Sequence, residues 1–167
     1  PYAFYGCTSI NSVTIPESAT SIGKSAFSGC SGLTEIAIPE NITIIGESAF
    51  SGCSNLAEVK MSDSVTEIAL YAFGECSSLT EIKIPDSVTS MGDGVFGGCE
   101  KLSSVTLSKN LTNIPWSCFY NCKGLLSITI PDSVETFDTY AFCESGIKTI
   151  TFGTGLKTIS KYAFEGC

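Results

Sequence analysis

Residues 33–53 read LTEIAIPENITIIGESAFSGC, and this order of apolar, proline, glycine and cysteine positions returns along the whole chain. Ile36 and Ile38 alternate with polar or small neighbours, a pattern typical of a β-strand. Pro39 lacks a backbone N–H donor and therefore ends that strand. The first third of the stretch thus predicts a short strand with one side facing a core.

The remainder of the stretch predicts a return to the core and then a turn. Ile42 and Ile45 carry the next apolar side chains, with a second short strand expected here and at residues 65–68 of the following copy. Gly46 permits a turn. The segment around Phe50 is too short for a long helix, so we expect a bend or a single helical turn there.

Three columns of residues define the repeat when the chain is aligned on its aromatic positions. The phenylalanines recur every 23 residues, with one final spacing of 22: Phe4, Phe27, Phe50, Phe73, Phe96, Phe119, Phe142 and Phe164. A second column holds Cys7, Cys30, Cys53, Cys76, Cys99, Cys122, Ser145 and Cys167. A third holds Ile15, Ile38, Met61, Ile84, Leu107, Ile130 and Phe152. A fixed period of this length predicts a solenoid.

Stacking is required because one repeat cannot close a core alone. Successive strands should lie about 4.8 Å apart in a continuous parallel sheet, with Phe stacked on Phe and Ile on Ile. We expect a mainly β fold, with this sheet on one face and turns or single helical turns on the other. Residues 1–167 should form one domain of about seven repeats of 23 residues, and their register at both ends suggests a longer parent.

Composition excludes several classes of function. The net charge is −8, with nine Lys, no Arg and no His, so no basic patch for a nucleic-acid backbone is expected. Without His, Ser-His-Asp and Cys-His nucleophiles and Cys-His zinc sites cannot form within this chain. The apolar runs are too short to span a membrane. We expect no cofactor, and the sequence does not set the oligomeric state.

The motif at residues 79–99, LTEIKIPDSVTSMGDGVFGGC, resembles the BspA-like (Treponema-type) leucine-rich repeat, and the resemblance covers essentially the whole chain. It departs where the Ile-Pro pair is lost at residues 61–62, 107–108 and 152–153, and at Pro115 and Ser145. The resemblance implies a horseshoe-like leucine-rich repeat solenoid from a cell-surface or secreted protein. It also implies adhesion to host, cell or matrix proteins, and it supplies no catalytic residues.

The nine cysteines leave three interpretations open. Disulfides would have to join neighbouring coils and would leave one Cys over, and a four-thiolate metal site lacks a Cys-x-x-Cys element. We favour the third, in which Cys packs as a small apolar side chain, including Cys118 in the Ala column. Cys143 follows Phe142 at a place otherwise held by polar or small residues or Tyr, so we expect it to be the exposed thiol.

The outward positions of the predicted strands supply most candidate binding residues. They form columns of Glu, Lys, Ser and Thr, and stacking would set Glu beside Glu with Lys two residues along to relieve the repulsion. The candidate ligand-binding residues of this face are Glu35, Glu58, Lys60, Glu81, Lys83, Thr106 and Thr129. A column after the prolines, at residues 17, 40, 63, 86 and 132, is acidic, and calcium binding there is a less favoured alternative.

The most irregular repeat is residues 114–120, IPWSCFY, which holds the only Trp. Trp116 falls in a column of mostly polar residues and should be exposed, with Tyr71 and Tyr140 in the next column. Exposed Trp and Tyr often anchor binding partners. The alternative is that Trp116 only covers a packing defect made by Pro115.

Together these features favour a non-catalytic protein-binding or adhesion module at the cell surface or outside the cell, with no membrane insertion in this segment. The alternative is a structural spacer that projects another domain. An enzyme is least favoured, since its only candidates are carboxylate pairs such as Glu58 and Glu81 on an open face. Asn41 and Asn110 begin N-x-T sequons in equivalent loops, whose use the sequence does not determine.

Overall fold

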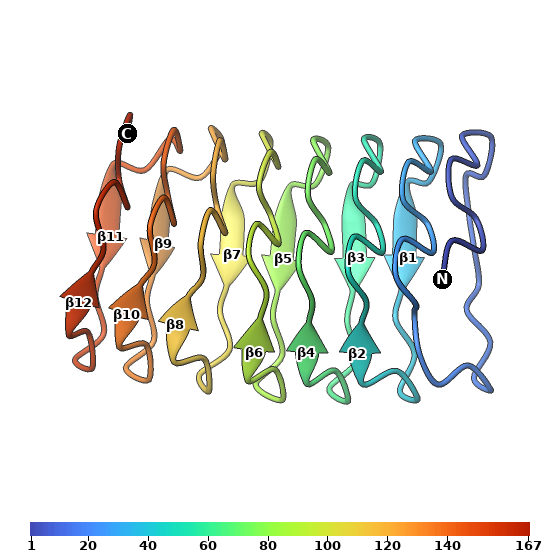
Figure 1. Ribbon diagram of the computed structural model, residues 1–167, viewed down its shortest axis with the longest axis horizontal. Helices are drawn as coiled ribbons and strands as arrows, with labels where there is room; N and C mark the ends of the chain where they lie inside the picture. Colours follow the sequence, from blue (N-terminus) through green and yellow to red (C-terminus); the bar gives the residue numbers. More distant parts are fainter.

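The computed structural model describes residues 1–167, which form a row of similar coils along the longest axis (Figure 1). Each coil from residue 35 onward contributes one three-residue strand and one two-residue strand. The three-residue strands are β1 (Glu35–Ala37), β3 (Glu58–Lys60), β5 (Glu81–Lys83), β7 (Ser104–Thr106), β9 (Ser127–Thr129) and β11 (Thr149–Thr151). The two-residue strands are β2 (Ile44–Ile45), β4 (Glu67–Ile68), β6 (Ser90–Met91), β8 (Asn113–Ile114), β10 (Thr136–Phe137) and β12 (Thr158–Ile159).

The two kinds of strand form two separate rows, each of parallel strands, and they run in opposite directions (Figure 1). Within each row the partners lie one repeat apart, as when Ile36 of β1 pairs with Val59 of β3 and Ile45 of β2 pairs with Ile68 of β4. The first coil joins the second row through a single bridge between Ile22 and Ile45. The predicted parallel solenoid and its second short strand are therefore confirmed. The predicted continuous sheet is wrong, because the rows divide into small sheets of two or three strands, with no ladder between β3 and β5, β7 and β9, or β6 and β8.

Burial alternates along the three-residue strands, as a half-buried strand requires. Ile36 is buried while Glu35 and Ala37 on either side are exposed. The same alternation holds in β3, β5 and β9. One face of this row therefore meets the core, and the other presents the Glu, Lys, Ser and Thr columns to solvent.

The core is a single cluster of 42 buried residues that runs through the coils. The phenylalanine column forms its spine: rings of neighbouring coils stack with centroids 5.1–5.9 Å apart and planes within 13° of parallel. Phe50, Phe73, Phe96, Phe119 and Phe142 have no exposed surface. Burial of each such ring contributes about 1.5–3 kcal/mol.

The cysteine column is buried from Cys30 to Cys122, and all nine thiols of the chain are free. Six of the thiols have a second role that the sequence pattern does not show, because each donates to a carbonyl of the preceding coil: Cys30, Cys53, Cys76, Cys99, Cys122 and Cys167. The Sγ of Cys53 lies 3.1 Å from the Phe27 carbonyl oxygen, and that of Cys76 lies 3.2 Å from the Phe50 oxygen. The thiols therefore act as apolar filling and also as weak hydrogen-bond donors between coils.

The segment after each two-residue strand is a run of turns, and the chain contains no helix. Left-handed residues recur at two places in each run: Ser48 has a φ of 52° and Gly52 a φ of 73° in the second coil. Such residues interrupt the uniform right-handed backbone that a helical turn needs. The turn alternative predicted for this segment is therefore confirmed, and the helical one is wrong.

Gly46 acts differently from the predicted turn residue, because it does not adopt a positive φ. Its N–H donates to the Ile22 carbonyl oxygen at 2.9 Å, and a Cβ atom there would lie 2.5 Å from that oxygen. The glycine is used for close approach of neighbouring coils, while Gly52 supplies the left-handed position.

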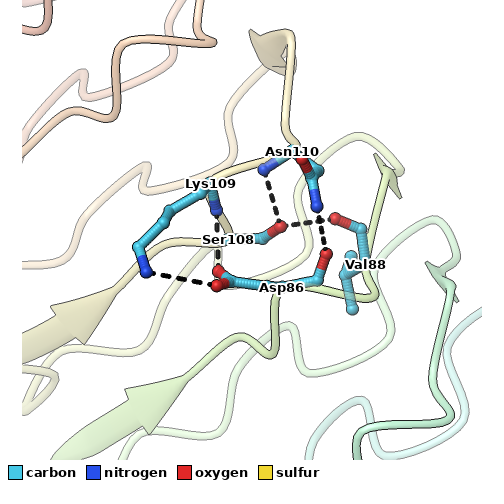
Figure 2. A network of polar contacts seen from close by, with 5 residues as sticks. All are labelled: Asp86, Val88, Ser108, Lys109 and Asn110. Atoms are coloured by element: carbon cyan, nitrogen blue, oxygen red, sulfur yellow. Dashed lines mark hydrogen bonds and ion pairs between the residues drawn. The ribbon is translucent and has the colours of Figure 1, made fainter.

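Serine replaces proline after two of the strands, and its hydroxyl then bonds to the preceding coil. Ser62 donates to the Pro39 carbonyl oxygen at 3.1 Å, and Ser108 donates to the Val88 oxygen at 2.7 Å. Figure 2 shows that the second of these belongs to a larger network in which both Lys109 and Asn110 contact Asp86. Polar contacts between coils thus compensate for the lost Ile-Pro pair.

No helix in the structure is long and apolar enough to cross a membrane.

Candidate functional site

The structure divides the predicted binding residues between two surfaces. Those on the three-residue strands surround three shallow depressions in the exposed sheet face. The largest group lines a depression of about 360 Å³ over β3, β5 and β7: Glu58, Lys60, Glu81, Lys83 and Thr106. Glu35 borders a second depression with Glu58 and Lys60, and Thr129 borders a third with Thr106.

Charges on the sheet face are partly neutralised within it. Glu35 and Glu58 are register partners in adjacent strands, as predicted, and Lys60 Nζ lies 2.9 Å from Glu58 Oε1. Lys83 makes no ion pair within 4 Å, so the predicted relief by lysine is confirmed only at Lys60. The Glu58 and Glu81 carboxylates lie in the open on this face rather than in an enclosed site.

Trp116 and Tyr140 lie on a different surface, in the turns that follow β8 and β10. They border a cleft of about 370 Å³ whose other aromatic walls are Tyr71 and Tyr120. Trp116 is 40% exposed, which confirms the predicted exposure of this residue. Its ring meets the Tyr140 ring edge to face, with centroids 6.5 Å apart and planes at 86°. The cleft shares no lining residue with the sheet-face depressions.

Pro115 explains why the repeat is irregular beneath this cleft. In the other coils the residue after the two-residue strand donates its N–H to the preceding coil, as Gly92 does to the Ile68 oxygen and Asp138 to the Ile114 oxygen. Pro115 has no N–H to donate. The next residue instead bonds to a side chain, because the Trp116 N–H donates to Asp93 Oδ1 at 3.2 Å. This contact anchors the backbone that carries the Trp116 ring.

Glycines form part of the floor of the cleft. Gly94 is left-handed, with a φ of 61°, and the Tyr71 ring occupies the space that a side chain at this position would take. Gly74 and Gly97 occupy the column of Tyr120 in the two preceding coils, and without side chains they leave that part of the cleft open. The cleft therefore exists because small residues in successive coils are flanked by large aromatic ones.

Sequence reasoning missed several residues of this cleft. Tyr120 lines the cleft and fills a column that holds Gly or Ser in the four coils before it. Glu75 and Gly94 also line the cleft, and neither is among the binding residues that the sequence predicts. The detectable signal was the change from small to aromatic residues along one column, but only the structure shows that Tyr71 folds over Gly94.

The prediction that Cys143 is the exposed thiol is wrong. Its side chain is 5% exposed and borders the inner side of the cleft, while Cys167 is exposed and Cys7 is partly exposed. Burial raises the pKa of the Cys143 thiol, and the nearby Glu165 and Glu144 carboxylates raise it further. The equivalent residues of other coils suggested an exposed position. The Cys143 side chain is buried because it is small enough to pack beneath the surrounding turns.

The acidic column after the prolines does not gather into a cluster. No group of three or more Cys, Asp or Glu side chains is placed to hold a metal ion. Asp86 instead contacts Lys109, whose backbone N–H donates to Oδ1 at 3.0 Å and whose Nζ lies 3.3 Å from Oδ2 (Figure 2). The first of these contacts lowers the pKa of Asp86, with further contributions from the Lys109 side chain and from Lys83.

Comparison with known proteins places this repeat in a family. A family model described as a BspA type leucine rich repeat region matches six copies, over residues 1–73 and 55–167. Proteins with such repeats typically mediate protein interactions. None of the curated proteins compared with this chain matches it.

Several solved bacterial structures are similar to the chain. A leucine-rich repeat protein of Treponema pallidum is 28% identical, with a TM-score of 0.79 over 84% of this chain and 66% of that one. A leucine-rich cell surface protein of Faecalibacterium prausnitzii is 24% identical, with a TM-score of 0.50 over 99% of this chain and 66% of that one. A leucine-rich repeat protein of Eubacterium ventriosum is 22% identical, with a TM-score of 0.72 over 81% of this chain and 44% of that one.

The chain thus spans about two thirds or less of the length of these three relatives. The last two likenesses support the fold, and the family rests on the repeat model, which covers both halves of the chain. The stacked coils, the Phe and Cys spines and the repeat match lead to one conclusion: this chain belongs to the BspA-type leucine-rich repeat family.

Proposed function

We propose that this chain is a non-catalytic module that binds another protein, and that its parent protein acts in adhesion at the cell surface. The observation that carries the proposal is the gathering of Tyr71, Trp116, Tyr120 and Tyr140 around one cleft on an otherwise regular solenoid. Large aromatic side chains that stay exposed are overrepresented among residues that dominate binding energies. The name of the F. prausnitzii relative, a cell surface protein, supports the location.

The sheet face is the second part of the proposed binding surface. Its exposed Glu35, Glu58, Lys60, Glu81, Lys83, Thr106 and Thr129 present a broad polar area. Such a face suits the polar rim of an interface better than its centre, because exposed charged pairs contribute little affinity. We therefore expect the aromatic cleft to supply most of the affinity and the sheet face to extend the contact.

The test is direct binding of the purified chain to immobilised extracellular-matrix proteins. A Trp116→Ala/Tyr120→Ala variant should lose at least about tenfold in affinity, the usual size of a hot-spot loss. The matched control is Tyr5→Ala, since Tyr5 occupies the column of Tyr120 in the first coil, is 63% exposed and lies outside the cleft. A Glu58→Lys/Glu81→Lys variant reports on the sheet face.

Equal binding by the wild type and the cleft variant, with loss in the sheet-face variant, would move the site to the sheet. Absence of binding to every matrix protein would favour the second candidate, a spacer. The monotony of the outward columns supports that candidate, because Ser and Thr fill both outward places in β7, β9 and β11. A binding face usually carries varied side chains.

A further inference from the structure

The charge in the lining of the aromatic cleft is negative. Glu75 is its only charged lining residue, and no lysine borders it. The Glu75 carboxylate lies over Gly98, where an added Cβ would come within 2.8 Å of both oxygens, and it makes no ion pair within 4 Å. Asp93 lies behind the Trp116 backbone, to which its Oδ1 is hydrogen bonded. The Glu75 side chain therefore lines the aromatic cleft while its carboxylate has no cationic partner.

Two further carboxylates act on the inner wall. Glu165 and Glu144 both raise the pKa of the Cys143 thiol, after the larger effect of burial, so their charges reach the side of the cleft that Cys143 forms. Asp93 likewise adds to the raised pKa of the Cys118 thiol, again after burial. A positive charge lies further out, since the Lys161 Nζ is 5.6 Å from the centroid of the Tyr162 ring, which stacks on Tyr140.

The shape of the cleft suits one long side chain. Its volume of about 370 Å³ lies near the lower end of the range of about 300–1,000 Å³ found for ligand pockets. The Tyr71 ring lies across Gly94, and the Trp116 and Tyr140 rings stand edge to face, so the cleft has rings at more than one orientation. One face of the Tyr140 ring is covered by the stacked Tyr162 ring. Ring faces attract cations through their negative quadrupole.

We propose that this cleft binds an arginine side chain presented by an extended segment of the partner protein, with the guanidinium between the aromatic rings and the Glu75 carboxylate. The inference rests on the proposed function, since it names the chemistry of the partner. Guanidinium is planar, stacks on aromatic rings and pairs with carboxylate through two N–H donors. A neutral segment would instead cover the Glu75 carboxylate without pairing it, which costs free energy.

Other ligand classes fit the lining less well. A sugar ring would stack on Trp116 or Tyr120, and hydroxyls of Ser51, Ser117 and the tyrosines lie in the lining. A neutral sugar would nevertheless bring no positive charge to the Glu75 carboxylate, which a guanidinium pairs. Oligosaccharide binding is therefore an outcome that the experiment must be able to reveal.

Trp116 is the only tryptophan, so its fluorescence reports directly on the cleft. The probe is the capped pentapeptide Gly-Gly-Arg-Gly-Gly, compared with the same peptide carrying citrulline, which keeps the shape of arginine and removes its charge. We expect a saturable change in Trp116 emission with the arginine peptide. The citrulline peptide should bind weaker by about two- to thirtyfold, the range that a cation–π contact spans. Equal affinity for the two peptides would overturn the proposal.

The carboxylate is tested by Glu75→Gln, which keeps size and hydrogen-bonding shape. We expect the preference for arginine over citrulline to fall toward one, while overall folding by circular dichroism stays unchanged. Glu67→Gln is the matched control, because it removes the same charge from an exposed position in β4 outside the cleft, and its preference should stay at the wild-type value. An unchanged preference in Glu75→Gln would exclude the predicted pairing.

The outcomes separate this inference from the proposed function. Matrix-protein binding that depends on Trp116 and Tyr120, together with no arginine preference, would retain the binding module and overturn the arginine site. A change in Trp116 emission with oligosaccharides, but with neither peptide, would also overturn the arginine site and would show that the cleft binds a sugar. An arginine preference without any matrix-protein binding would support the site and reject the tested partners.

Discussion

The phenylalanine spine and the aromatic cleft use the same kind of side chain in opposite ways. In the spine, each ring stacks on its equivalent in the next coil, as Phe50 does on Phe73 with centroids 5.3 Å apart and planes within 4°. In the cleft, Tyr140 stacks on its equivalent Tyr162 with centroids 5.3 Å apart, but Trp116 meets Tyr140 at 86°, and Tyr71 lies where Gly94 has no side chain. The spine is set by repetition, and the cleft combines repeated tyrosines with Trp116 and Tyr120, which depart from their columns.

This contrast separates stability from recognition. A buried ring with equivalent neighbours on both sides leaves a cavity when removed, because the stacked coils cannot collapse into it. Removal of a ring from the surface of the cleft leaves no buried cavity and changes only the shape of the cleft. Substitutions in the two regions should therefore move different observables.

The largest effect is expected from Phe73→Ala. Phe73 is fully buried between Phe50 and Phe96, so its loss should lower the free energy of unfolding by about 3–5 kcal/mol. Urea denaturation followed by circular dichroism measures the change. A loss below about 1 kcal/mol would contradict the spine as the main source of stability.

The cysteine column should make the chain sensitive to alkali. Burial raises the pKa of Cys53 from 9.0 to about 12, with a smaller contribution from Cys30. Below pH 9 the thiol is protonated in both states, so this group adds no pH dependence. Above pH 9 the unfolded chain loses the proton first, and stability should fall up to about pH 12.

For one thiol the slope reaches at most about 1.4 kcal/mol per pH unit. The measurement is urea denaturation of the wild type and Cys53→Ala at a series of pH values from neutral to alkaline. The variant should be less stable at neutral pH and should lose stability less steeply above pH 9, where Cys53 begins to ionise in the unfolded chain. Parallel curves for the two proteins would show that burial of Cys53 does not control the effect.

A smaller effect is expected from Gly94→Ala, with Gly52→Ala as the matched control. Both glycines are left-handed, so each change should cost about 1–2 kcal/mol through the backbone. Only the Cβ at position 94 collides with the Tyr71 ring, because around Gly52 the nearest atom would be 3.7 Å away. Gly94→Ala should therefore also change Trp116 emission, and an equal change in Gly52→Ala would refute the Tyr71 contact as its cause.

The smallest effect on stability is expected from Tyr120→Ala. Tyr120 is 44% exposed and takes no part in the aromatic stacking of the spine. The free energy of unfolding should therefore change by about 0.5 kcal/mol or less, as is usual for surface substitutions. The same urea experiment used for Phe73→Ala measures it. A loss as large as that of Phe73→Ala would erase the distinction between the two regions.

Much of the fold could be predicted, since the evidence for it is periodic. The columns of Phe50, Cys53 and Ile38 identify equivalent places in every coil, and equivalent places in a stack have equivalent surroundings. Prediction failed for Cys143 and for the helical turn near Phe50. In both cases the result depends on how one turn packs against neighbouring turns, which no single column records.

The candidate site was only partly predictable for a related reason. Trp116 is identifiable because it breaks the pattern, Tyr140 because it is an aromatic residue in the next column, and the sheet-face residues because they follow the pattern. Nothing in their spacing indicates that Trp116 and Tyr140 share a cleft with Tyr120 while Glu58 and Lys83 lie on a separate surface. The two surfaces are separate because of the path of each coil. The sheet-face residues lie on the three-residue strand, and the cleft residues lie in the turns that follow the two-residue strand.

The sequence by itself determined the stacking of coils, the buried Phe and Cys columns and the parallel strands, because a 23-residue period places identical side chains at identical points. The tertiary structure alone decided which irregular residues meet. Tyr71 and Glu75 come from one coil, and Trp116 and Tyr120 come from the next coil but one. They form one cleft because Gly94 and Gly97 leave the surface of the coil between them low. Such a juxtaposition depends on side-chain volume across coils, which becomes defined only when the coils are packed together.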